Sequence, residues 1–325
     1  MTVDPLHEEI APTGRRIVLL GPQRREPMLR DVVADLELRG PLATVTAGWE
    51  ERESEDEELA AHLGSTTRNL GLYPRAEEVF REDREVRDLL NERFDRLRTL
   101  QTIYRFRLAP LLTTARDLLS RTDPAAPDEL YGPQIESGIE MVRTLDAEHL
   151  ACTKRLDEEI AERIGARRRE SIQRHQDQLA EILHDVGGLL IAGGHVGILL
   201  NRLRLFDVLE LCPGTPIVAW SAGAMVLGER IVLFHDRPAQ GPGDAEIYAP
   251  GLGLYSGVVP LPHASERLEL EDPARVALMA RRFAPDECAV LDDSCRVDRV
   301  AEGWSRSAST GRLADSGRVL SEVTA

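Results

Sequence analysis

The chain has 325 residues, of which 42% are hydrophobic and 30% charged, enough to bury a core without disulfide staples. Its formal charge of −16 argues against nucleic acid as the main partner, because phosphate binding needs a basic face. We see no signal-peptide pattern and no apolar run of the ~18 residues that a membrane span needs, so we expect a cytoplasmic protein without a membrane partner. The cysteines show neither a disulfide framework nor Cys/His metal-ligand spacing, which predicts reduced thiols: Cys152, Cys212, Cys288 and Cys295.

The first third of the chain alternates short apolar runs with amphipathic stretches. Residues 1–14 are polar and predict a loose N-terminal arm. After them we expect strands at 15–21, 42–48 and 67–73, with a helix at about 27–38 and a short helix after the acidic run 50–58. This β-α-β-α-β rhythm predicts a parallel sheet with right-handed crossovers.

Residues 74–186 instead show a charged, helical pattern. One apolar stripe recurs at helical spacing through Val86, Leu90, Phe94 and Leu97, and others follow further along. Pro110 should break or kink the first long helix, and the segment 123–133 is rich in turn residues. We expect three or four helices here, as an all-helical insertion into the sheet domain.

The sheet pattern resumes at GGLLIAGG (187–194), followed by an amphipathic helix and a strand at 215–220. Short strands and turns fill the tail from Cys288 onward. We therefore predict an α/β core formed by 15–73 and 187–325, with a mostly parallel sheet flanked by helices.

The stretch PIVAWSAGAMVLGE (216–229) is the most informative part of the sequence. An apolar strand leads directly into Ser221, which has small residues two positions away on each side, Ala219 and Gly223. Small neighbours are what a strained strand-to-helix turn needs to expose a nucleophilic serine, although a serine after a strand is commonly only a helix N-cap.

The preceding strand ends in Gly193 and Gly194, which should reach the same sheet edge as Ser221. Their amides, together with that of Ala222, could form an oxyanion hole. The alternative is a tight turn in which glycine only permits the backbone angles.

A serine nucleophile also needs a base and a carboxylate that orients the base. His263 ends an apolar run, VVPLPH, which suits a base delivered to the sheet edge, and His195 and His235 are less favoured. Asp236 is the expected orienting acid, with Asp244 and Glu246 as alternatives in the same loop. The other histidines lie in the arm or on charged helices and are expected at the surface: His7, His62, His149, His175 and His184.

The runs LLIAGGHVGILLNRL, PIVAWSAGAMVLGERI and VVPLPH together resemble the peptidase S51 family, which includes dipeptidase E and cyanophycinase. The resemblance covers residues 187–270 well and 15–73 weakly. It implies a fold similar to class I glutamine amidotransferases, which is flavodoxin-like, with Ser221 in place of the amidotransferase cysteine. It also places the family's histidine on His263 and, for the dipeptidase E branch, its acid on Asp236.

The resemblance implies hydrolysis of small peptides with an aspartyl or β-aspartyl residue at the cleaved bond. It implies no metal and no organic cofactor. A substrate carboxylate needs an arginine, for which Arg237 and Arg202 are candidates, and His195 should also contact the substrate. The sequence departs from the family at His195 and Ala219, and the helical segment has no counterpart there.

The sequence leaves two alternative functions open. One is a non-catalytic binding or assembly module in which the helical insertion recognises a partner. The same insertion could form the interface of a homodimer. The other is an amidotransferase-like enzyme, which is weaker because Cys212 lies nine residues before the serine.

Overall fold

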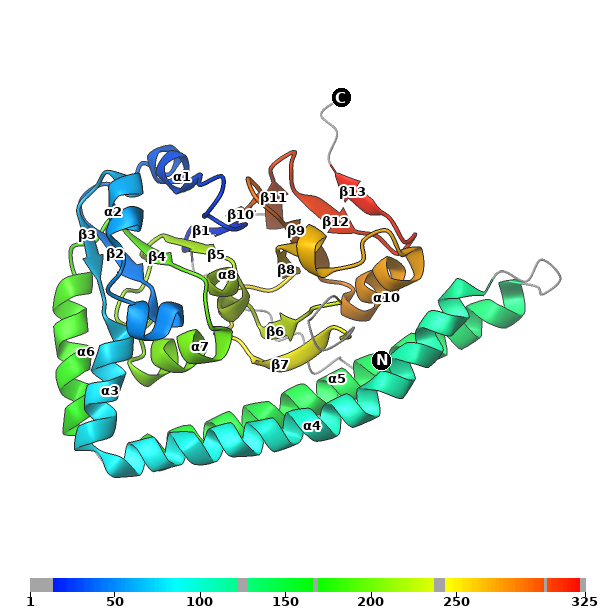
Figure 1. The fold of residues 1–325 in the computed structure, drawn as a ribbon, viewed down its shortest axis with the longest axis horizontal. Helices are drawn as coiled ribbons and strands as arrows, with labels where there is room; N and C mark the ends of the chain where they lie inside the picture. The colour runs from blue at the N-terminus through cyan, green and yellow to red at the C-terminus, as the bar shows by residue number, and fades with distance from the viewer. Residues whose placement is uncertain (1–13, 122–127, 166–168, 237–242, 301–302, 322–325) are drawn as a thin grey trace.

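The computed structural model describes residues 14–121, 128–165, 169–236, 243–300 and 303–321 (Figure 1). Its main sheet has seven strands in the order β11-β10-β1-β5-β4-β2-β3. The run from β1 to β3 is parallel, and β10 and β11 add an antiparallel edge. The strands are β1 (Ile17–Leu20), β2 (Leu42–Val45), β3 (Thr67–Asn69), β4 (Gly188–Ile191), β5 (Ile217–Trp220), β10 (Arg296–Val300) and β11 (Gly303–Arg306).

A second sheet has the order β13-β12-β9-β8, and β6 pairs with β7 as a separate hairpin. Only β8 and β9 run parallel in this sheet. These strands are β6 (Arg230–Leu233), β7 (Glu246–Pro250), β8 (Val258–Pro262), β9 (Glu287–Leu291), β12 (Gly311–Leu313) and β13 (Val319–Ser321).

Both faces of the main sheet are buried, which explains why its central strands are continuous apolar runs. In β1, Val18 and Leu20 point to one side of the sheet, and Ile17 and Leu19 point to the other. Helices α1 and α2 cover the first side, while α3, α7 and α8 cover the second. Around the sheets the structure has α1 (Leu29–Asp35), the 3₁₀ helix η1 (Ala47–Arg52), α2 (Glu57–Leu63), α7 (Val196–Leu205), α8 (Ala222–Leu227), α9 (Ala264–Arg267) and α10 (Pro273–Phe283).

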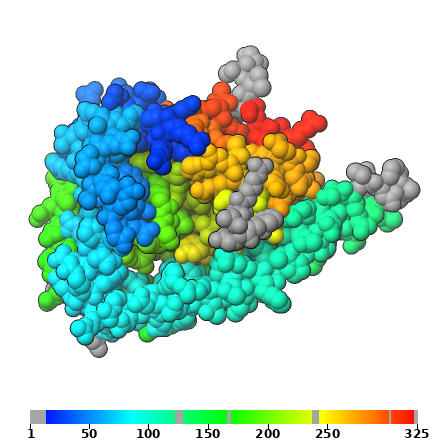
Figure 2. All heavy atoms as spheres, in the orientation of Figure 1, coloured from blue at the N-terminus to red at the C-terminus, as the bar shows by residue number. Residues whose placement is uncertain are grey.

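The helical part of the chain consists of α3 (Leu72–Glu82), α4 (Arg84–Ser120), α5 (Asp128–Gly165) and α6 (Glu170–Leu183). Helices α3 and α6 lie at the β3 edge of the main sheet (Figure 1). Helices α4 and α5, of 37 and 38 residues, are each roughly 55 Å long and pack along each other. They pass β7 and α10, and Figure 2 shows them as a ridge that projects beyond the core.

A buried polar network fixes this helix pair to the core. Arg282 of α10 donates to both carboxylate oxygens of Asp146 on α5, at 2.6 and 2.8 Å, and to the carbonyl of Ala245 at 2.6 Å. The Tyr104 hydroxyl of α4 donates to Asp146 at 2.7 Å and accepts from the Ile247 amide of β7. The Arg282 side chain is only 1% exposed, so its charge is neutralised inside the protein rather than by water.

The helices differ from the sequence expectations at several points. Pro110 does not break α4, because Leu108 and Leu112 are buried on both sides of it and packing outweighs the lost hydrogen bond; a kink at Pro110 stays a prediction. Helix α5 already includes residues 128–133, so the connection between the two long helices is shorter than 123–133, and residues 122–127 lie outside the described ones. Phe94 is 49% exposed, with the Arg98 guanidinium over its ring, rather than part of the buried stripe.

Two of the expected surface histidines are buried, while His7 lies outside the described residues. His149 stacks on Tyr104, and His175 contacts the ring of Phe206 edge-on. The expected homodimer through the helical segment stays a prediction.

Candidate active site

Ser221 stands at the carboxyl end of β5, directly before α8. Its backbone angles are φ 52° and ψ −124°, a region that costs a non-glycine residue about 1–3 kcal/mol. The sequence permits this turn because Gly223 lies against β4: a β-carbon added there would be 2.3 Å from the Ile191 carbonyl oxygen. A strained serine between a buried strand and a helix is the geometry of a nucleophile elbow.

Gly193 and Gly194 lie beside this turn, as the sequence predicts. A β-carbon on Gly193 would lie 2.7 Å from the Ser221 β-carbon and 3.3 Å from the Ala222 amide nitrogen. Gly194 has φ +116°, which favours glycine, and a β-carbon there would be 2.3 Å from the Gly48 carbonyl oxygen.

The amides around the glycine pair differ in whether they have a hydrogen-bond acceptor. The flanking amides of Ala192 and His195 are bonded to backbone carbonyls, at 2.9 and 2.7 Å. The amides of Gly193 and Gly194 donate no hydrogen bond within the described part of the chain. Ala222 is the first residue of α8, so its amide has no acceptor within that helix. Three backbone amides without an acceptor among the described residues thus lie in the two turns that meet at the serine.

His263 follows β8 and precedes α9, with left-handed backbone angles of φ 58° and ψ 33°. Its imidazole is half-buried, with the Glu266 carboxylate 3.6 Å from Nδ1. Burial lowers the pKa of His263, the charge of Arg267 lowers it further, and nearby carboxylates oppose both effects. The imidazole is therefore favoured in its neutral form, which can accept a proton.

Backbone hydrogen bonds and close packing connect the serine turn to His263. The Ser221 amide donates to the Leu20 carbonyl at 3.3 Å, and the His263 amide donates to the Leu291 carbonyl at 3.1 Å. Between them, Gly21 packs so tightly that a β-carbon there would overlap the Asp292 carbonyl. The two side chains share no hydrogen bond in the described structure, and such bonds are often long before substrate binds.

The structure does not bring the Asp236 carboxylate to His263. One Asp236 oxygen accepts the Glu269 amide at 2.9 Å, and the other pairs with Arg275 at 2.6 Å. The Asp236 amide donates to the Arg267 carbonyl at 2.7 Å. Asp236 therefore fixes the chain just after α9, so that it holds the segment carrying His263 rather than the imidazole itself.

Each of the alternative carboxylates contacts an arginine of the helical segment instead. Asp244 pairs with Arg116, and Glu246 pairs with Arg105 through a bond of 2.6 Å. Both interactions attach α4 to the β6–β7 hairpin. Neither carboxylate is bonded to His263 in the described structure.

The residues expected to bind substrate are placed as follows. His195 caps α7, its Nδ1 accepting the Ile198 amide at 3.2 Å, and its ring is exposed. Arg202 is buried between α3 and α7, paired with Glu77 and over the ring of Phe80, so it serves packing. Arg237 lies outside the described residues.

Cys212 is unsuited to act as a nucleophile. It is buried, and its thiol lies 3.3 Å from the Val208 carbonyl oxygen. Burial raises its pKa, which disfavours the reactive thiolate. Among the described residues, no group of three or more His, Cys, Asp or Glu side chains is placed to hold a metal ion.

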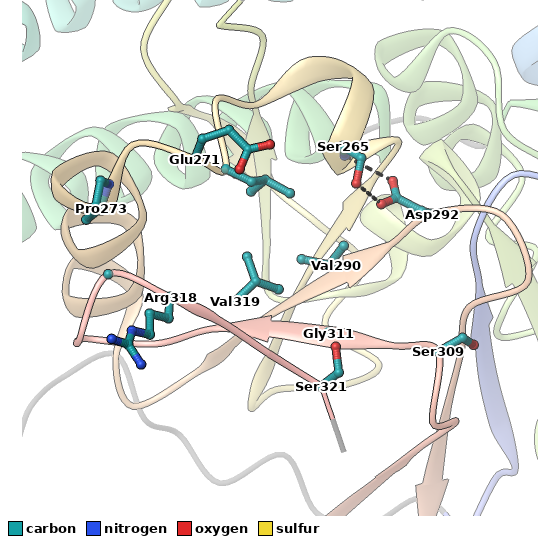
Figure 3. Close-up of a pocket in the computed structure, with 12 residues that line it drawn as sticks. Ser265, Glu271, Pro273, Val290, Asp292, Ser309, Gly311, Arg318, Val319 and Ser321 are labelled. Atoms are coloured by element: carbon teal, nitrogen blue, oxygen red, sulfur yellow. Dashed lines mark hydrogen bonds between the residues drawn. The ribbon is translucent and has the colours of Figure 1, made fainter. Parts of the chain in front are cut away.

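Two of the cavities in the described structure are each lined in part by a residue of α9, Ser265 in one and Arg267 in the other. The first, of about 660 Å³, is shown in Figure 3 and lies over β9, β12 and β13. Ser265 and Asp292 point toward each other at one end of it, where the Asp292 carboxylate accepts two hydrogen bonds from Ser265. The second, of about 630 Å³, is lined by Arg267 and by Met225 of α8.

Two residues of this region were not anticipated. Gly48, at the end of the expected strand 42–48, lies under the glycine pair and accepts the His195 amide through its carbonyl oxygen. Arg267 is half-buried beside His263 and lines the second cavity. Its position four residues after His263 is the signal that could have found it, because such residues share a helix face.

This α/β fold, with a serine at a strand-to-helix turn, agrees with comparisons to known proteins. Residues 161–302 match the family model described as peptidase family S51. This segment holds Ser221, the glycine pair and His263, so the similarity to the family covers the candidate site.

The similar curated proteins are two forms of Peptidase E. They come from Shewanella sp. (strain W3-18-1) and Shewanella putrefaciens (strain CN-32 / ATCC BAA-453). Each is 38% identical over 72 residues, which is 21% of this chain and 30% of the relative's length. A solved structure, that of a peptidase from an acI-B1 Actinobacterium, aligns over 94% of this chain and 96% of its own, with 12% identity and a TM-score of 0.46. Among the helices of the described ranges, none is both long and apolar enough to cross a membrane.

Proposed function

We propose that the chain is a serine-type hydrolase that cleaves a peptide or amide bond in small peptides. The observation that carries the proposal is the strained backbone of Ser221 at the end of β5, packed against Gly193. Strain of this kind persists only where the surrounding structure holds it, and it clusters at functional sites. The match of residues 161–302 to the model of peptidase family S51 and the match to Peptidase E over 72 residues support the same reaction class.

In the proposed mechanism the Ser221 hydroxyl attacks the substrate carbonyl while His263 takes its proton. The amides of Gly193, Gly194 and Ala222 then stabilise the oxyanion. His263 returns the proton to the leaving amine, and water releases the acyl group from Ser221 in a second cycle of the same steps. Asp236 acts in this scheme as a positioning residue for the segment 263–269.

We further propose that the substrate carries a carboxylate. The Arg267 guanidinium donates no hydrogen bond to another described residue, and it is half-buried next to His263. A half-buried arginine without such a partner can bind a carboxylate through charge-assisted hydrogen bonds. In this proposal Arg267 has the carboxylate-binding role that the sequence suggested for Arg202 or Arg237. A carboxylate bound there is consistent with a peptide that has an aspartyl or β-aspartyl residue at the cleaved bond.

Hydrolysis of a dipeptide panel that includes Asp-X and β-Asp-Arg tests the proposal. We expect Ser221→Ala to lose at least ~10³-fold in kcat. Ser305→Ala, which removes an exposed hydroxyl on β11, should leave the activity unchanged. A Ser221→Ala variant as active as the wild type would refute the nucleophile assignment. Absence of any hydrolysis by the wild type would instead favour the non-catalytic binding module.

A further inference from the structure

The cavity lined by Arg267 of α9 is built jointly by the core and by helix α4. Met225 and Phe234 line it from the core, and Leu108 lines it from α4, all three being buried side chains. Ala109 of α4 also lines the cavity but is exposed, so its methyl group borders open space. The cavity therefore has an apolar floor, and a volume of about 630 Å³ lies in the usual range of small-molecule sites.

The charged groups at its rim largely neutralise one another. Arg105 is paired with Glu246, and Asp244 is paired with Arg116. Arg267 is the cation of the rim that donates no hydrogen bond within the described ranges. An occupant that places an apolar group on the floor and a carboxylate at Arg267 would match this pattern.

Two residues that line the cavity, Met225 and Arg267, each follow one of the two proposed catalytic residues by one helical turn. The Met225 amide donates to the Ser221 carbonyl at 3.2 Å, and the Arg267 amide donates to the His263 carbonyl at 3.0 Å. One turn of helix advances about 5.4 Å. A short peptide whose reacting bond lies at Ser221 would have to extend by about one such turn to reach these lining residues.

Helix α4 is a fixed wall of the cavity rather than a free lid. Tyr104, one turn before Leu108, is held by Asp146 and by the Ile247 amide. Gln101, one turn earlier again, donates to the Ile247 carbonyl at 3.1 Å. Buried polar contacts of this kind fix one arrangement of the elements that they join.

We infer that helix α4 forms one side of a substrate subsite, which accepts the apolar side chain of the residue next to the acidic one in a short peptide. The inference rests on the proposed function and adds to it a role for the helical segment in specificity. Leu108 and Ala109 are then the α4 residues that decide which side chain fits.

Filling the cavity from α4 tests this inference. Ala109→Phe is expected to lower kcat/KM for Asp-Leu and Asp-Phe at least ~10-fold more than for Asp-Gly, because the large side chains lose their space. Ala151→Phe is the matched control, since Ala151 is exposed on α5 and does not line the cavity. It should leave the ratio between the peptides unchanged. If Ala109→Phe fails to fold, Ala109→Leu makes the same test with a smaller side chain.

The outcomes separate this inference from the proposed function. If the wild type cleaves the peptides and Ala109→Phe affects all three equally or none, the inference is wrong and the proposed function stands. If the wild type cleaves none of them, the proposed function fails. The subsite is then tested by measuring the binding of Asp-Phe to the full chain by calorimetry. Weaker binding by Ala109→Phe than by Ala151→Phe would then support the subsite, and equal or undetectable binding would overturn it.

Discussion

Replacing Asp146 by Asn removes the charge that neutralises Arg282 between α5 and α10. Both carboxylate oxygens of Asp146 accept from Arg282, whose side chain is 1% exposed. Burial lowers the pKa of Arg282, and the Asp146 carboxylate is the main group that raises it. The substitution removes that carboxylate, but an arginine side chain is not deprotonated in proteins, so a buried charge without its counter-charge remains. Breaking one side of a buried pair typically costs about 3–5 kcal/mol.

That loss is large beside the ~5–15 kcal/mol by which most domains are stable. With a urea m-value near 3 kcal/mol/M, the unfolding midpoint should fall by roughly 1–2 M. Circular dichroism during urea unfolding measures this shift directly. The double variant Asp146→Leu/Arg282→Met should recover most of it, because no buried charge then remains.

Glu159→Gln is the matched control on the same helix pair. Glu159 of α5 accepts two hydrogen bonds from Arg96 of α4, at 2.7 and 2.8 Å, but both side chains are nearly half exposed. Exposed pairs contribute little, because water and salt already solvate the charges. If the two variants shift the urea midpoint equally, burial is not what makes the Asp146 pair important.

Three further predictions concern the proposed site. Ser221→Gly should be more stable than Ser221→Ala by about 1 kcal/mol in urea unfolding, because glycine accepts φ 52° without strain, and equal stability of the two would argue against a strained elbow. Arg267→Gln should move the acidic limb of the kcat/KM profile to higher pH: burial and the Arg267 charge lower the pKa of His263, so removing the charge raises it and the proton is retained to higher pH. An acidic limb that stays in place or moves to lower pH would contradict the assignment of His263 as the base. Gly194→Ala should destabilise the fold by several kcal/mol, since its β-carbon would meet a backbone oxygen at 2.3 Å. Gly214→Ala, also at positive φ but with no atom within 4 Å of its added β-carbon, should cost only about 1 kcal/mol, and similar losses in the two variants would show that the close approach is unimportant.

The parts of the site that depend on neighbouring residues could be predicted from the sequence. A buried strand followed by Ser221 with small residues on both sides specifies the turn, because each requirement falls within five residues. The same holds for Gly193 and Gly194, whose place after an apolar run brings them to the edge where parallel strands end. The α/β fold with a mostly parallel sheet follows from the same alternation of patterns, and the structure confirms it.

The partners of the charged residues could not be predicted in this way. Asp244 and Glu246 meet arginines 128 and 141 residues earlier in the chain, and Asp236 meets Arg275. Which cation a carboxylate meets depends on how α4 and α10 dock, and that is decided by packing over the whole molecule. For the same reason Arg267 could be assigned to a cavity only once the structure was known.

The burial of polar residues in the helical segment could not be predicted from the sequence either. Arg93 and Gln101 continue the buried stripe of α4, and His149 stacks on Tyr104, although all three look like surface residues by type. A periodic hydrophobic pattern predicts which apolar residues are buried, but not which polar ones are. A polar side chain is buried when a distant segment supplies its hydrogen-bond partner. Local sequence thus specified the serine turn and the sheet, because their determinants are neighbours in the chain, while the charge pairs and the cavity wall arose only when long-range packing brought α4, α5 and α10 together.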